Sequence, residues 1–129
     1  MYLMRVSKDN WDKREDLVEV DPQIIAYWRK VNSVHRWFIN KLADGEDRNC
    51  DPLKATKDDL QEIVEICSEI LKDHSKAKEL LPTSGGFFFG GTEYDEDYFQ
   101  ELEDTIRQIS EVIEGTDWGN QVVYYYAWW

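Results

Sequence analysis

Residues 121–129 read QVVYYYAWW, the strongest strand signal in this chain of 129 residues. Valine and tyrosine in succession are β-branched and aromatic, the kinds of side chain that strands favour. Residues 2–6, YLMRV, form a second short segment of this type, whose alternate side chains point to one side: Tyr2, Met4 and Val6. Because a lone strand cannot satisfy its own backbone hydrogen-bonding groups, we expect residues 2–6 to pair with 121–128, antiparallel.

The segment between these strands predicts helices, beginning with one of about 20 residues. Asp21 suits an N-cap and Pro22 the first helical position. The apolar stripe of this first helix has helical spacing and comprises Ile24, Trp28, Val31, His35, Phe38 and Leu42. The charged segments on either side, SKDNWDKRED (7–16) and ADGEDRNCDP (43–52), predict surface loops.

Two further long helices have clear boundary signals. Thr56 followed by Asp59 is typical of a capping box, and the apolar face behind it comprises Leu60, Ile63, Val64, Cys67, Ile70 and Leu71. Ser75 is expected to cap a short helix that Pro82 stops. Thr92 or Asp95 is expected to start the last helix, which Gly115 ends, with a stripe of Phe99, Leu102, Ile106, Ile109 and Ile113. The sequence therefore predicts one α+β domain over 1–129: three main helices and a short one packed on the paired terminal strands.

Composition and charge narrow the function classes. Hydrophobic residues make up 42% of the chain, too many for a disordered acidic protein, and the net charge is −12. Such a charge disfavours direct contact with nucleic acid or an anionic membrane and favours a basic partner, although solubility alone also explains it. Cys50 and Cys67 have neither metal-site nor disulfide-framework spacing, and His74 has no partner at metal-ligand spacing. With no long apolar run, we expect a cytoplasmic protein without metal or cofactor.

The charges are unevenly distributed. Between Pro22 and Ala43 there are four cations and no acid, whereas residues 86–129 carry ten acids and only Arg107 as a cation. The basic first helix can pack structurally beside the acidic last one. Alternatively, arginines interleaved with aromatic rings suit a phosphate, a carboxylate or a stacked base, in a ligand site comprising Trp28, Arg29, Asn32, His35 and Arg36. His35 itself interrupts the apolar stripe, where a neutral, hydrogen-bonded core histidine is the favoured interpretation.

Residues 84–92, SGGFFFGGT, place three phenylalanines between glycine pairs. Burial of even two Phe side chains contributes about 3–6 kcal/mol, so we expect Phe87 and Phe89 to be buried. Phe88 then faces the opposite way and is a candidate anchor for a partner. Four carboxylates at the following helix start argue against a phosphate there. The predicted partner-binding residues are Phe88, Tyr94, Asp95, Tyr98, Trp128 and Trp129.

Two segments carry a resemblance to a known family. At YWRKVNSVHRWF (27–38) and ELLPTSGGFFFGGTEYDEDYF (79–99), the chain resembles small uncharacterised proteins encoded in bacteriophage genomes. Those proteins share a Tyr-Trp-Arg-Lys…His…Trp-Phe stretch, a Gly-Phe-Phe-Phe-Gly segment and an aromatic C-terminus that ends in Trp. The resemblance implies an accessory protein in the cytoplasm of an infected bacterium, and it implies no known activity.

Two function hypotheses follow, and no catalytic constellation of residues supports an enzyme over them. In the first, the protein is non-enzymatic and binds, and inhibits, a host or phage macromolecule that is basic or handles nucleic acid, including defence systems. In the second, it binds a nucleotide or phospho-compound, or acts on one, through the basic first helix. Homo-oligomerisation through the edge of the C-terminal strand is a third hypothesis.

Overall fold

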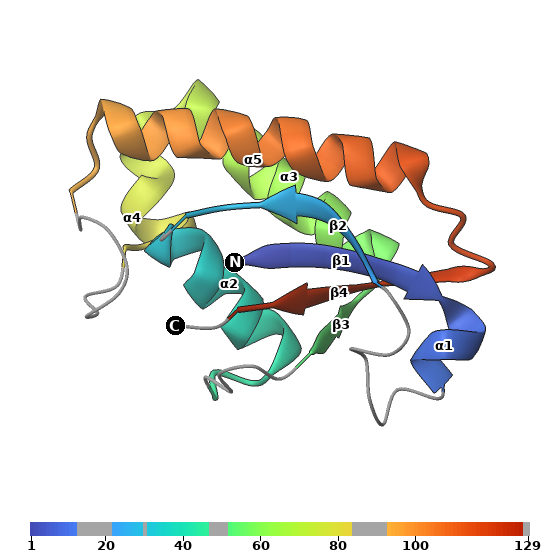
Figure 1. Ribbon diagram of the computed structural model, residues 1–129. Helices are drawn as coiled ribbons and strands as arrows, with labels where there is room; N and C mark the ends of the chain where they lie inside the picture. Colours follow the sequence, from blue (N-terminus) through green and yellow to red (C-terminus); the bar gives the residue numbers. More distant parts are fainter. Residues whose placement is uncertain (13–21, 30, 47–51, 84–92, 128–129) are drawn as a thin grey trace.

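The structure, a computed structural model, describes residues 1–12, 22–29, 31–46, 52–83 and 93–127 (Figure 1). The elements in chain order are β1 (Tyr2–Ser7), α1 (Lys8–Asp12), β2 (Gln23–Tyr27), α2 (Asn32–Leu42), β3 (Leu53–Ala55), α3 (Lys57–Lys72), the 3-10 turn η2 (His74–Lys76), α4 (Ala77–Leu80), α5 (Glu96–Gly115) and β4 (Gln121–Tyr126). The predicted α+β class is confirmed.

The four strands form one antiparallel sheet in the order β2-β1-β4-β3. The predicted pairing of the two terminal segments is confirmed, with a register that runs from Tyr2 opposite Tyr126 to Ser7 opposite Gln121. However, β4 is a central strand, because β3 pairs with its other side along residues 123–125. The expectation that the C-terminal strand is an edge strand is therefore wrong, since β2 and β3 are the outer strands.

The predicted 20-residue first helix is also wrong. Residues 23–27 form β2, which pairs with β1, and the helix α2 begins only at Asn32. The apolar run QIIAY is too short to distinguish the spacing of a helix from that of a strand. Its β-branched residues pack well in a strand that covers the open side of β1. One segment expected to be a loop likewise contains regular structure, because α1 lies within 7–16, with Trp11 buried. The strand β3, which begins directly after the expected loop 43–52, was not predicted.

The capping signals in the sequence predicted the start of α3 and both ends of α5 correctly. Thr56 and Asp59 form the capping box of α3, Asp95 caps α5, and α5 ends at Gly115. The short turn is capped by Asp73 rather than by Ser75. The buried stripe of α5 is rotated by about one position from the predicted one and comprises Tyr98, Leu102, Thr105, Ile109 and Val112; the half-buried flank comprises Phe99, Ile106 and Ile113.

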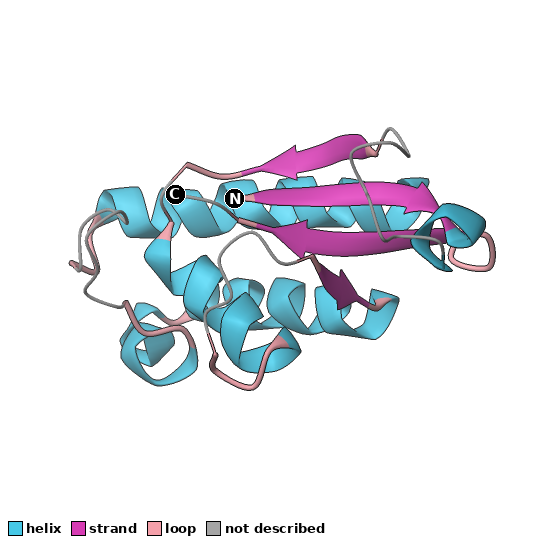
Figure 2. Ribbon diagram, turned by 60° about the horizontal axis from the view of Figure 1, so that its bottom comes forward, coloured by secondary structure: helices cyan, strands magenta, loops and turns pink. Residues whose placement is uncertain are grey.

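Two apolar clusters flank the sheet, and the long helices lie together on one side of it (Figure 2). The larger core joins Leu3, Val123 and Tyr125 on one sheet face to buried residues of α2, α3 and α5. On the other face α1 contributes Trp11 to a small cluster with Val6, Val122 and Tyr124. In the described part of the chain, no helix combines the length and hydropathy that a membrane span requires.

Arg5 of β1 fixes the end of α5 relative to the sheet. Its guanidinium Nη1 donates to the carbonyl oxygen of Gly115 at 2.8 Å and to Thr116 Oγ1 at 3.2 Å, and its Nη2 donates to Gln23 Oε1 at 2.9 Å. A cation at this position complements the negative end of the helix dipole. With this end held, α5 runs past β2 and presents its acidic side to the end of that strand.

Candidate functional site

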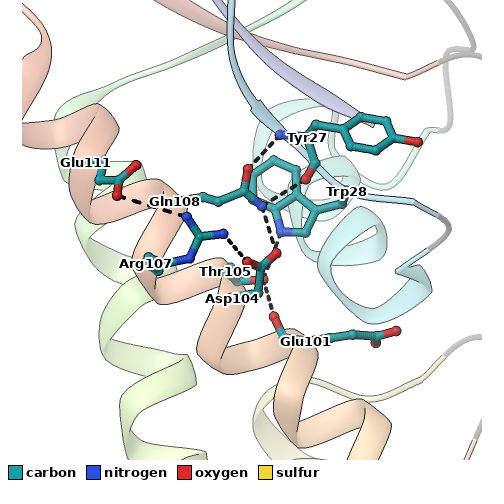
Figure 3. A network of polar contacts seen from close by, with 8 residues as sticks. All are labelled: Tyr27, Trp28, Glu101, Asp104, Thr105, Arg107, Gln108 and Glu111. Carbon is teal, nitrogen blue, oxygen red and sulfur yellow. Dashed lines mark hydrogen bonds and ion pairs between the residues drawn. The ribbon is translucent and has the colours of Figure 1, made fainter.

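A cleft of about 530 Å³ lies between the end of β2 and the first half of α5. One wall comes from the segment that leads from β2 into α2, namely Tyr27, Trp28, Arg29 and Val31. The other wall comes from α5, namely Asp97, Gln100, Glu101 and Asp104. Figure 3 shows several of these side chains and the contacts that hold the two walls together.

Three carboxylates line the α5 wall because the spacing of four and then three residues places them on one side of the helix. Asp104 is engaged: it pairs with Arg107, and its Oδ2 accepts a hydrogen bond from Gln108 Nε2 at 2.9 Å. Asp97 and Glu101 differ, because neither carboxylate has an ion-pair or hydrogen-bond partner among the described residues. The cleft therefore presents two uncompensated negative charges one helical turn apart.

The surroundings of the Glu101 carboxyl perturb its pKa. Partial burial raises its pKa above the ordinary value, and the nearby negative charges of Asp97 and Asp95 raise it further. The charged form of Glu101 is consequently disfavoured in the free protein, and a cation placed in the cleft would offset the effect of the neighbouring negative charges.

The opposite wall is held rigidly by hydrogen bonds to α5. The Trp28 indole, only 2% exposed, donates from Nε1 to Thr105 Oγ1 at 2.9 Å. The Thr105 hydroxyl in turn donates to the carbonyl oxygen of Glu101 at 2.7 Å. Gln108 contacts both backbone groups of Tyr27: its Oε1 accepts from the Tyr27 N–H and its Nε2 donates to the Tyr27 carbonyl oxygen, each at 2.8 Å (Figure 3). The walls thus have fixed positions before anything binds.

The structure divides the predicted ligand-binding set. Trp28 and Arg29 line the cleft, and Arg29 is exposed without an ion-pair partner in the described residues. Asn32 and His35 are buried, and His35 Nδ1 lies 2.8 Å from Tyr125 Oη, as expected of a hydrogen-bonded core histidine. Arg36 is half-buried and does not line the cleft. Arg29 precedes α2, so Arg29, Asn32 and Arg36 do not lie on one helix as the sequence predicted.

The predicted partner-binding residues have mostly structural contacts where they are described. Tyr94 is half-buried and its hydroxyl accepts the Thr83 N–H at 3.1 Å. Asp95 accepts the Tyr98 N–H as the cap of α5. Tyr98 is only 3% exposed and donates from its hydroxyl to the Leu81 carbonyl oxygen at 2.7 Å, so its ring does not reach the surface as a contact residue should. Phe88, Trp128 and Trp129, like the whole Gly-Phe segment, lie outside the described residues.

The residues that sequence reasoning missed are the acids of the cleft, Asp97, Glu101 and Asp104. The excess of acids after residue 86 was visible in the sequence, but which of them face an opening depends on the path of β2. No group of His, Cys, Asp or Glu within the described ranges could hold a metal ion. The cleft instead suits an ammonium or guanidinium group.

The cleft thus combines carboxylates on one wall with a partly exposed aromatic ring on the other, since Tyr27 is 49% exposed. Comparisons with protein-family models, with curated proteins and with solved structures found no match.

Proposed function

We propose that this is a non-enzymatic accessory protein that binds a basic host or phage macromolecule and inhibits it. The proposed targets are proteins that handle nucleic acid, including those of defence systems. Such proteins have basic surfaces. The resemblance to phage-encoded proteins and the net charge of −12 support this class. The observation that carries the proposal is the unpaired state of Asp97 and Glu101 within an open, rigid cleft.

A basic side chain of the partner is the natural occupant of this cleft. Two carboxylates one turn apart can each accept hydrogen bonds from a guanidinium fork, which is the stronger, charge-assisted kind of contact. The Tyr27 ring at the rim offers a face for the same cation. The overall negative field would speed the encounter and make it sensitive to salt.

A nucleotide or phospho-compound in the same cleft has weaker support. Arg29 is the one cation among the described lining residues, whereas three carboxylates line the facing wall. A phosphate there would meet like charge at short range, and Asn32, His35 and Arg36 do not line the cleft to offset it.

The test uses a fluorescein-labelled octa-arginine peptide and fluorescence anisotropy. We expect the double variant Asp97→Asn/Glu101→Gln to bind at least tenfold more weakly than the wild type, because each lost charged hydrogen bond is worth about 1.5–3 kcal/mol. The control Glu103→Gln/Glu114→Gln makes the same charge change at exposed positions of α5 outside the cleft. Equal losses in the two variants would show that general charge, and not the cleft, binds the peptide. A target captured from infected cells is then tested for inhibition by the wild type and by both variants.

A further inference from the structure

Positive charge gathers at the end of the sheet away from the acidic cleft. A hollow of about 300 Å³ there is lined by three lysines from three separate elements: Lys8 opens α1, Lys54 lies in β3 and Lys57 opens α3. The remaining wall is mostly neutral and comprises Ala55, Thr56, Asp58, Trp118, Gln121, Val122 and Val123. The described part of residues 22–43, the segment with four cations and no acid, contributes nothing to this hollow.

The three lysines are unpaired in a chain rich in acids. Elsewhere Lys41 pairs with Glu62 at 3.0 Å and Lys76 with Glu69 at 2.7 Å. In contrast, none of the lysines in the hollow has an ion-pair partner among the described residues, although the chain has 27 acids against 15 Lys and Arg. Asp58 is the single carboxylate among the described lining residues. The hollow therefore keeps a net positive charge in a strongly negative protein.

The position of Lys57 is unfavourable for folding. As the first residue of α3 it places a cation at the positive end of the helix dipole, where acids such as the neighbouring Asp58 and Asp59 are preferred. Lys54, three residues earlier, and Lys8 add further positive charge to the same hollow. Local choices that oppose stability without a visible structural gain tend to occur where a protein binds something.

We propose that this hollow binds a small phosphate-bearing anion, such as a phosphomonoester or pyrophosphate. Three ammonium groups can compensate two or more negative charges, and a volume of about 300 Å³ lies at the small end of ligand pockets. The half-buried Trp118 gives the wall an aromatic surface for the organic part of such a ligand. The net charge of −12 repels a long polyanion, which favours a small ligand over nucleic acid. This site is independent of the proposed function, because it uses other residues and the opposite charge.

The test is isothermal titration of the whole protein with pyrophosphate at low ionic strength. We expect saturable 1:1 binding that weakens about tenfold in Lys54→Gln and in Lys57→Gln, which corresponds to ~1.4 kcal/mol. Lys72→Gln is the matched control, because Lys72 is exposed at the other end of α3, and it should bind as the wild type does. The cleft variant Asp97→Asn/Glu101→Gln should also retain pyrophosphate binding, which separates this proposal from the previous one.

Three outcomes would overturn the proposal. The first is no saturable pyrophosphate binding in the millimolar range. The second is an equal loss of affinity in Lys57→Gln and Lys72→Gln, which would indicate only general charge. The third is equal or tighter binding of a different anion. Citrate that binds as tightly as pyrophosphate would remove the phosphate assignment, and single-stranded DNA that binds more tightly than pyrophosphate would indicate a nucleic-acid surface.

Discussion

The side-chain amide of Gln108 pairs with the backbone of Tyr27 as a neighbouring strand would. Both the N–H and the carbonyl oxygen of Tyr27 are bound, each at 2.8 Å, by one side chain from α5. Since β2 is an outer strand of the sheet, this contact closes part of an edge that would otherwise be open to another chain. It also joins the two walls of the acidic cleft.

Replacement of Gln108 by alanine should therefore loosen this edge. We expect Gln108→Ala to lower the free energy of unfolding by about 1–2 kcal/mol, because two backbone groups lose their partner, and to speed hydrogen exchange at the Tyr27 amide. Gln100→Ala, an exposed position on the same helix, should change stability by less than about 0.5 kcal/mol. Urea denaturation measures both variants, and equal effects would contradict the edge-closing role.

The buried contact between Trp28 and Thr105 should behave as a coupled pair. Trp28→Phe and Thr105→Val each remove one side of a 2.9 Å hydrogen bond, at a cost of about 1–3 kcal/mol each. Thr105→Val leaves the buried Trp28 N–H without this acceptor, whereas in Trp28→Phe the Thr105 hydroxyl keeps its hydrogen bond to the Glu101 carbonyl oxygen. The double variant should be less destabilised than the sum of the singles by about 1 kcal/mol. A strictly additive result in the double-mutant cycle would mean that the contact contributes nothing.

Adjacent tyrosines of β4 offer a matched comparison in the core. Tyr125 Oη lies 2.8 Å from His35 Nδ1, whereas Tyr124 points to the other face of the sheet and packs against Trp11. We expect Tyr125→Phe to cost about 1–2 kcal/mol, because it deprives a buried histidine of this partner, and Tyr124→Phe to stay within about 0.5 kcal/mol. Chemical denaturation distinguishes the two, and similar losses would argue that only ring packing matters.

Features that depend on one short segment were predictable from the sequence. The Thr56–Asp59 capping box, the Asp95 cap and the two terminal strands each follow from residues a few positions apart. The buried face of α3 followed from periodicity alone. These signals act locally, so no knowledge of the remaining fold was needed.

Features that depend on distant partners were not predictable. The run 23–27 is short enough to fit a helix or a strand, and its pairing with β1 decides between them. The acidic cleft exists only because β2 ends beside α5, so the exposure of Asp97 and Glu101 follows from that packing and not from their spacing. The lysine-lined hollow likewise joins residues 8, 54 and 57. Residue 8 is far from the other two in the sequence, and the spacing of three between 54 and 57 does not by itself predict a site.

Cys67 should be chemically inert in the folded protein. It is fully buried, and burial raises the pKa of its thiol to about 12, so the reactive thiolate is scarce at pH 8. In a Cys50→Ser variant, Ellman's reagent should label Cys67 at the rate of unfolding in native buffer and promptly in denaturant. Prompt labelling without denaturant would contradict this burial.

Glu101 should lower the stability of the free protein at neutral pH. Its folded-state pKa is raised by burial and then by Asp97 and Asp95, so the protonated form is favoured on folding. That contribution is fully present below the unfolded pKa, about 4.3, and is lost as the pH rises through the folded value. Glu101→Gln, which stays neutral, should therefore raise the free energy of unfolding at pH 7 by up to about 1 kcal/mol, a bound that allows for solvent screening. Below about pH 4 the variant and the wild type should converge.

Glu103→Gln, at an exposed position of α5, is the matched control and should change the free energy of unfolding at pH 7 by less than about 0.5 kcal/mol. Parallel urea titrations at the two pH values measure the difference, and a destabilised Glu101→Gln at pH 7 would contradict the idea that this carboxylate is held uncompensated for a cationic partner.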